Sequence, residues 1–159
     1  MSTYKVAFIS LGCAKNLVNT EQMMALARDA GYTVTAEPEG ADVAVLNTCG
    51  FIESAKSEAI DNILALAQLK ADGKLGKLLV AGCLSQRYQG ELLEELPEVD
   101  GILGTGSYTD IVPAIQAVME GDEPTFFGDI NHTIEDGSRM VTTPPYTAYL
   151  KIAEGCDNR

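Results

Sequence analysis

Four cysteines are the residues of this 159-residue chain whose type and spacing could do chemistry. Cys13, Cys49 and Cys83 share one context, because each closely follows a short apolar run and precedes a stretch of helical character. Three thiolates that converge on one point suit an iron–sulfur cluster, which normally takes four protein ligands and with three keeps one iron open. Ordinary burial is the alternative, since free cysteine is among the most buried residue types.

The elements around these cysteines decide whether three sulfurs can meet. Apolar runs predict strands at residues 5–11, 32–35, 43–46, 77–80 and 101–103. Helical patterns cover residues 18–30, 55–71, 89–96 and a stretch that ends at Met119. Strands that are apolar throughout are typical of a sheet covered on both faces. We therefore predict an α/β fold, an open and mainly parallel sheet of about five strands with helices on both faces, flavodoxin-like or Rossmann-like.

This fold class predicts where the cysteines lie. In an open parallel sheet the carboxyl ends of the strands form one edge, and ligands bind there. Right-handed crossovers place the first, third and fourth strands side by side in a flavodoxin-like order. Because these strands precede Cys13, Cys49 and Cys83, we expect the three sulfurs at one edge, close enough to bind a single cluster.

The residues next to the cysteines also fit such a site. Glycines at positions 12, 50 and 82 would let the backbone approach a bulky group closely. Four polar residues follow the first cysteine and either line the cluster pocket or cap the next helix: Lys15, Asn16, Asn19 and Glu21.

Composition and charge exclude several classes of protein. An apolar content of 46% argues against intrinsic disorder. A net charge of −12 argues against tight nucleic-acid binding by this piece alone, and is compatible with a basic protein partner or with a simple solubility role. No apolar run is long enough to span a bilayer, and the first residues lack the features of a signal peptide. We therefore expect the protein to be in the cytoplasm and not to associate with a membrane.

The chain divides into three parts. Residues 1–120 carry the strand–helix pattern and form one domain, large enough to bury a core without disulfides. Residues 121–145 are rich in Gly, Pro, Asp and Asn, and we interpret them as a linker with one short strand. Residues 146–159 start a new apolar strand that leads to Cys156, and the chain stops three residues later. We therefore expect the sequence to be a truncated piece of a longer protein.

Four segments resemble, in order, the motifs of the radical-SAM methylthiotransferase family. They are residues 10–21 (SLGCAKNLVNTE), 47–56 (NTCGFIESAK), 81–88 (AGCLSQRY) and 150–159 (LKIAEGCDNR). The resemblance covers nearly the whole chain. The fourth segment resembles the opening of the CxxxCxxC motif, with Cys156 as its first cysteine.

The resemblance implies two 4Fe–4S clusters and S-adenosylmethionine. Cys13, Cys49 and Cys83 would hold the auxiliary cluster that supplies the sulfur. Cys156 would be the first ligand of the radical-SAM cluster, which cleaves S-adenosylmethionine to a radical, and a second S-adenosylmethionine would supply the methyl group. The other two ligands of that cluster, the barrel and a C-terminal RNA-binding-like domain are absent. The resemblance implies that the whole protein is a transferase. This piece alone is expected to be inactive, with no catalytic residue of its own.

The resemblance also implies a substrate. The segments LGCAKNLVN and NTCGFIESAK favour the branch that attaches a methylthio group to the β-carbon of an aspartate in a small-subunit ribosomal protein. The alternative is the branch that modifies isopentenylated adenosine in tRNA. A flavodoxin-like electron carrier and a thiol–disulfide protein are further alternatives. Against them, the loop GCAKN is not a flavin phosphate loop, and no CxxC pair is present.

Overall fold

The computed structural model describes residues 4–11, 14–48, 53–82, 91, 94–104, 108–122 and 125–126. Its strands are β1 (Lys5–Ser10), β2 (Thr33–Thr35), β3 (Val43–Thr48), β4 (Lys77–Gly82), β5 (Gly101–Leu103) and β6 (Thr125–Phe126). Its helices are α1 (Ala14–Asp29), α2 (Glu53–Ala71) and α4 (Ile111–Met119), and the 3-10 turn η1 (Tyr108–Asp110) leads into α4.

The strands form a single sheet in the order β2-β1-β3-β4-β5-β6, and every neighbouring pair is parallel. The predicted α/β fold with an open parallel sheet is therefore confirmed. The sheet has one strand more than the five predicted, because β6 pairs with β5 from within the segment 121–145, where one short strand was expected. The strands β1, β3 and β4 are consecutive neighbours, as the flavodoxin-like order requires.

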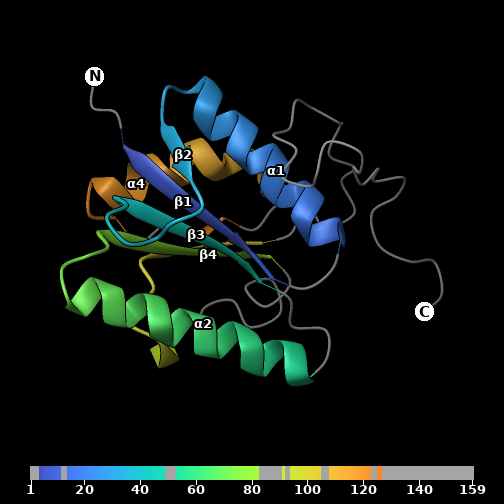
Figure 1. Cartoon of the computed structure of the whole chain (residues 1–159), viewed down its shortest axis with the longest axis vertical. Coiled ribbons are helices and arrows are strands. Elements are labelled where there is room, and N and C mark those ends of the chain that lie inside the picture. Colours follow the sequence, from blue (N-terminus) through green and yellow to red (C-terminus); the bar gives the residue numbers. More distant parts are fainter. Residues whose placement is uncertain are drawn as a thin grey trace.

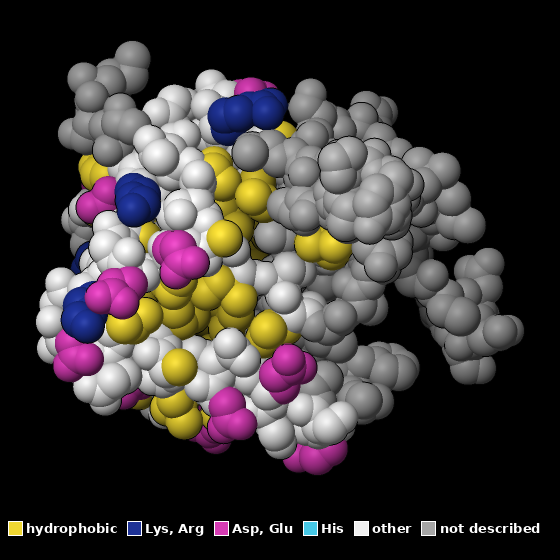
Figure 2. Space-filling view, viewed as in Figure 1, with side chains coloured by type: hydrophobic (Ala, Val, Ile, Leu, Met, Phe, Trp, Pro, Cys, Tyr) yellow, Lys and Arg dark blue, Asp and Glu magenta, His cyan; other side chains and the backbone are white. Residues whose placement is uncertain are grey.

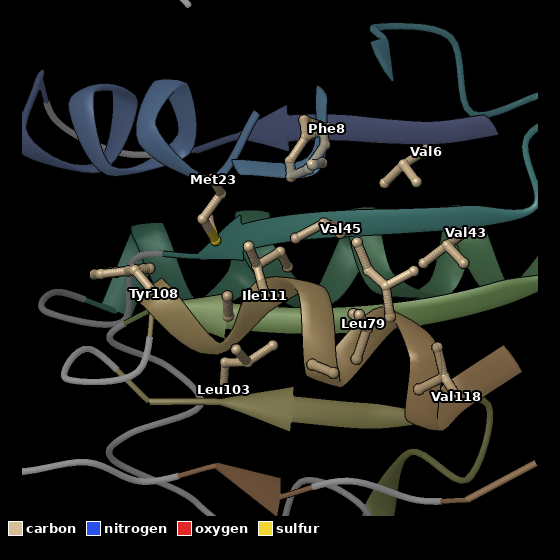
Figure 3. Packing of buried hydrophobic residues seen from close by; sticks show 14 residues of the cluster. Val6, Phe8, Met23, Val43, Val45, Leu79, Leu103, Tyr108, Ile111 and Val118 are labelled. Atoms are coloured by element: carbon tan, nitrogen blue, oxygen red, sulfur yellow. The ribbon is translucent and has the colours of Figure 1, made fainter. Parts of the chain in front are cut away.

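Helices cover both faces of the sheet, as predicted, with α1 and α4 on one side and α2 on the other (Figure 1). Successive side chains of a strand point to opposite faces, so each strand contributes to two cores. Val6 and Phe8 of β1 pack toward α1 and α4, whereas Ala7 packs on the side of α2. Figure 3 shows the first core, in which Met23 of α1 and Ile111 of α4 meet the strands.

Four elements extend beyond the ranges that the sequence predicted. The strands β3 and β4 continue to Thr48 and Gly82, the helix α1 begins at Ala14 rather than at residue 18, and α2 begins at Glu53 rather than at residue 55. Apart from Leu17, the added residues are polar or small and lack the apolar pattern on which the prediction depended. Of the predicted helix 89–96, the described residues 91, 94 and 95 are helical, and most of the others lie outside the described residues.

The amino edge of the sheet is held by two aspartates that directly precede strands. The backbone N–H of Lys5 donates to Oδ2 of Asp42 over 2.8 Å. In the same way, the N–H of Leu78 donates to Oδ2 of Asp100 over 2.8 Å, and Lys70 Nζ lies 2.6 Å from the same oxygen. Each carboxylate thus satisfies a backbone donor at the start of the neighbouring strand. These contacts lie at the end of the sheet opposite the cysteine-bearing loops.

Two adjacent residues of α2 provide a test of this packing. Ile63 is fully buried against the sheet, whereas Leu64 is 49% exposed. Ile63→Ala is expected to lower the free energy of unfolding by about 2–5 kcal/mol, because it removes buried methyl groups and leaves a cavity. Leu64→Ala is the matched control and should change it by less than about 0.5 kcal/mol. Urea unfolding followed by circular dichroism measures both, and equal losses would contradict the packing described.

Candidate metal centre

The structure describes the strand ends that lead into the predicted metal site. The cysteines themselves, Cys13, Cys49, Cys83 and Cys156, lie outside the described residues. Within the described ranges no group of three or more His, Cys, Asp or Glu side chains is placed to hold a metal ion. The three-thiolate site therefore stays a prediction, and the described residues show what frame it would have.

The strand ends that precede the three cysteines lie next to one another at the carboxyl edge of the sheet, where the arrowheads of β1, β3 and β4 point (Figure 1). Ser10 is paired with Asn47, and Thr48 is paired with Gly82. Cys49 and Cys83 thus directly follow a pair of facing residues. Neighbouring strands are about 4.8 Å apart, so the ends of β1, β3 and β4 span about 10 Å. Loops of a few residues can bridge that span.

Asn47 connects all three cysteine-bearing segments and is fully buried. Its backbone carbonyl accepts a hydrogen bond from the N–H of Leu11, two residues before Cys13, over 2.9 Å. Its side-chain Nδ2 donates to Oγ1 of Thr20 over 3.0 Å. Thr20 belongs to α1, the helix that starts immediately after Cys13. Asn47 of β3 is therefore hydrogen-bonded to a residue before Cys13 and to a residue after it.

Thr48 and Gly82 connect the third segment to β3 in a similar way. The Oγ1 of Thr48 donates to the carbonyl of Ala81 over 2.6 Å. Gly82 has a φ of +97°, a left-handed conformation that favours glycine. A Cβ at this position would collide with Oδ1 of Asn47 and with the backbone of Thr48. The sequence suggested that glycine at this position lets the backbone approach a bulky group. In the structure, the group that Gly82 approaches closely is the neighbouring strand β3. Gly12 and Gly50 lie outside the described residues.

The polar residues of α1 are buried rather than placed as caps. Asn19, Thr20, Glu21 and Gln22 are all less than a tenth exposed. Because α1 begins at Ala14, Asn19 and Glu21 lie well inside the helix, and the capping role considered for them is wrong. The side chains of Lys15 and Asn16 lie outside the described residues. Burying a polar side chain costs free energy unless it is hydrogen-bonded. Four consecutive buried polar residues on the helix after Cys13 therefore indicate a role beyond forming the helix.

Sequence reasoning assigned no role to Thr20, Asn47 or Thr48. The sequence does mark Asn47 and Thr48, because these two polar residues end an otherwise apolar strand directly before a cysteine. Thr20 carries no such signal. Its contact with Asn47 joins residues 27 positions apart, and only the packing of α1 on the sheet brings them together.

The described surface is predominantly acidic. The helix α2 exposes Glu53, Glu58 and Asp61, and Figure 2 shows acidic side chains distributed over the visible face. Two of the basic side chains, Lys70 and Lys77, lie beside Asp100 at the amino edge. Such a surface attracts basic partners and repels phosphate backbones. No helix among the described residues has the length and apolar character needed to cross a bilayer.

The strand ends that precede the three cysteines are arranged in a way that is compatible with an iron–sulfur cluster. Cysteine thiolate is the usual ligand of such clusters. The three segments that carry the thiols leave the sheet at one edge, from adjacent strands, and side-chain hydrogen bonds hold their ends together. The predicted donors are therefore compatible with one shared site.

Comparison with known proteins agrees with the motifs. The family model described as "Uncharacterized protein family UPF0004" matches residues 5–104. Three similar curated proteins are each named "Ribosomal protein uS12 methylthiotransferase RimO". They come from Pelotomaculum thermopropionicum (48% identical over 98% of this chain), Desulforamulus reducens (51% over 97%) and Clostridioides difficile (50% over 97%). The chain spans 35% of the length of each of these relatives. The match to more than half of the chain shows that this protein belongs to the family UPF0004.

Proposed function

We propose that this chain is the N-terminal, cluster-bearing domain of a radical-SAM methylthiotransferase. The observation that carries the proposal is the adjacency of β1, β3 and β4, whose carboxyl ends precede Cys13, Cys49 and Cys83. The names of the similar proteins support the same activity. In this proposal residues 1–120 form the domain, residues 121–145 a linker, and residues 146–159 the start of the radical-SAM domain.

Cys13, Cys49 and Cys83 would hold a 4Fe–4S cluster as thiolates. With three protein ligands one iron would keep an open position, and the cluster would supply the sulfur for the reaction. Cys156 would be the first ligand of a second 4Fe–4S cluster, at which S-adenosylmethionine binds. The residues of this chain would place the first cluster at the carboxyl edge of the sheet and hold its three loops in register.

The proposed substrate is an aspartate of the small-subunit ribosomal protein uS12, modified at its β-carbon in the cytoplasm. Two observations support it: the wording of the similar proteins' names and the acidic surface of the described residues, which suits a basic ribosomal protein better than tRNA. The transferase activity belongs to the whole protein. This domain alone is expected to bind a cluster and to transfer nothing.

Anaerobic reconstitution with iron and sulfide tests the proposal. We expect the chain to take up about four irons and to develop the broad visible absorption of a cubane cluster. A colourless product with fewer than one iron per chain would contradict the assignment. For the substrate, the full-length protein is incubated with S-adenosylmethionine and either uS12 or tRNA, and mass spectrometry then locates the methylthio group. Modification of tRNA instead of uS12 would contradict the ribosomal assignment.

A further inference from the structure

We propose that Asn47 and Thr48, the β3 polar pair, are positioning residues that set the spacing of the three cysteine-bearing loops and thereby the stability of the cluster. This inference rests on the proposed function. It goes further in assigning a role to side chains that are not themselves ligands. The two residues end the central one of the three strands, directly before Cys49.

The contacts of the β3 polar pair reach each of the other two loops within two residues of a cysteine. Leu11, bonded to the carbonyl of Asn47, is two residues from Cys13. Ala81, whose carbonyl accepts from Thr48, is two residues from Cys83. Gly82, against which Oδ1 of Asn47 packs, is the residue directly before Cys83. The bond to Leu11 comes from the backbone of Asn47. A shift of the side chains, by contrast, would be transmitted to Thr20, Ala81 and Gly82.

Backbone pairing alone does not supply this control. The ladder sets the distance between β1, β3 and β4, but it leaves open where the helix after Cys13 lies relative to β3. Apolar packing through Met23 and Ala27 holds α1 on the sheet. The side-chain bond between Asn47 and Thr20 adds a directional contact between the helix and the end of β3. Both residues are at most 3% exposed, so water does not compete for the bond. Side chains that orient metal ligands from outside the ligand set commonly change metal affinity 10- to 100-fold when they are replaced.

The decisive experiment changes Thr20 rather than a residue near the thiols. Thr20→Val keeps the side-chain shape and removes the acceptor of the Asn47 amide. Thr20→Ser keeps the hydroxyl. After reconstitution, iron loss to a chelator is timed for each protein, and the electron paramagnetic resonance spectrum of the reduced cluster is recorded. We expect Thr20→Val to lose iron about 10- to 100-fold faster with an altered spectrum, and Thr20→Ser to behave like the unmodified chain.

Asp100→Asn is the matched control. It weakens a part-buried hydrogen-bonded contact at the amino edge of the sheet, opposite the strand ends that precede the cysteines. It should lower the melting temperature and leave the iron-loss rate and the spectrum unchanged. If Asp100→Asn also loses iron faster, in proportion to its fall in melting temperature, the inference is overturned, because iron loss would then report only the stability of the fold.

A second variant keeps the test open if Thr20→Val does not fold. Thr48→Val removes the hydroxyl that donates to Ala81 and keeps the side-chain shape. Faster iron loss from Thr48→Val supports the inference, and a rate equal to that of the unmodified chain overturns it. Failure of the proposed function is distinguishable from both outcomes, because the unmodified chain would then take up no cluster at all.

Discussion

Cys49→Ala is expected to abolish uptake of the cluster while leaving the apo fold nearly as stable as before. Cys49 directly follows β3, the central one of the three strands that precede the predicted ligands. Two remaining thiolates do not hold a cubane that already lacks a fourth protein ligand. The two cores of the sheet are formed without the cysteines, so the free energy of unfolding should change little. Iron content and visible absorption after reconstitution, together with urea unfolding of the apo protein, measure both effects.

Cys156→Ala is the matched control for that variant. In the proposed function Cys156 belongs to another cluster, so its replacement should leave the iron content of the reconstituted chain unchanged. Uptake of a full cluster by the Cys49→Ala chain, or loss of the cluster on replacing Cys156, would refute the assignment of three thiolates. An apo chain without cooperative unfolding would refute the expectation that the sheet folds without its cluster.

Gly82→Ala is expected to be among the most damaging single substitutions in the described part of the chain. The backbone at Gly82 is left-handed, and a Cβ there would meet Asn47 and Thr48 of the neighbouring strand. We expect a loss of about 3 kcal/mol in the free energy of unfolding, combining ~1–2 kcal/mol for the left-handed Cβ and ~1–3 kcal/mol for overpacking. Cluster uptake should fall as well, because β3 and β4 are forced apart directly before Cys49 and Cys83.

Gly73→Ala separates backbone strain from collision. Gly73 also has a positive φ, +76°, but nothing lies within 4 Å of the position that its Cβ would take. Its replacement should cost only about 1 kcal/mol and leave cluster uptake intact. Chemical denaturation of the two apo variants in parallel gives the comparison. A loss at Gly82 no larger than that at Gly73 would show that the approach of β3 to Gly82 is looser than described.

The frame of the site could be predicted from the sequence because it depends on local patterns. Apolar runs located the strands, and the helices between them implied parallel pairing with right-handed crossovers. With the analogy to a flavodoxin-like strand order, these rules predicted the first, third and fourth strands to be neighbours, as the structure has them. The limits of the elements were less predictable. Asn47 and Thr48 interrupt the apolar pattern, yet they belong to β3 because their polar groups find partners on Thr20 and Ala81.

The sequence by itself therefore determined the fold class and the edge of the sheet at which the strands before the three cysteines end. Only the tertiary structure decided which non-cysteine residues hold that edge together. The contact of Asn47 with Thr20 and the collision that a side chain at Gly82 would cause both involve residues more than 25 positions apart. Local propensity is set by neighbours along the chain, whereas such contacts exist only once α1 and β4 have packed beside β3, and no pattern of residue types encodes them.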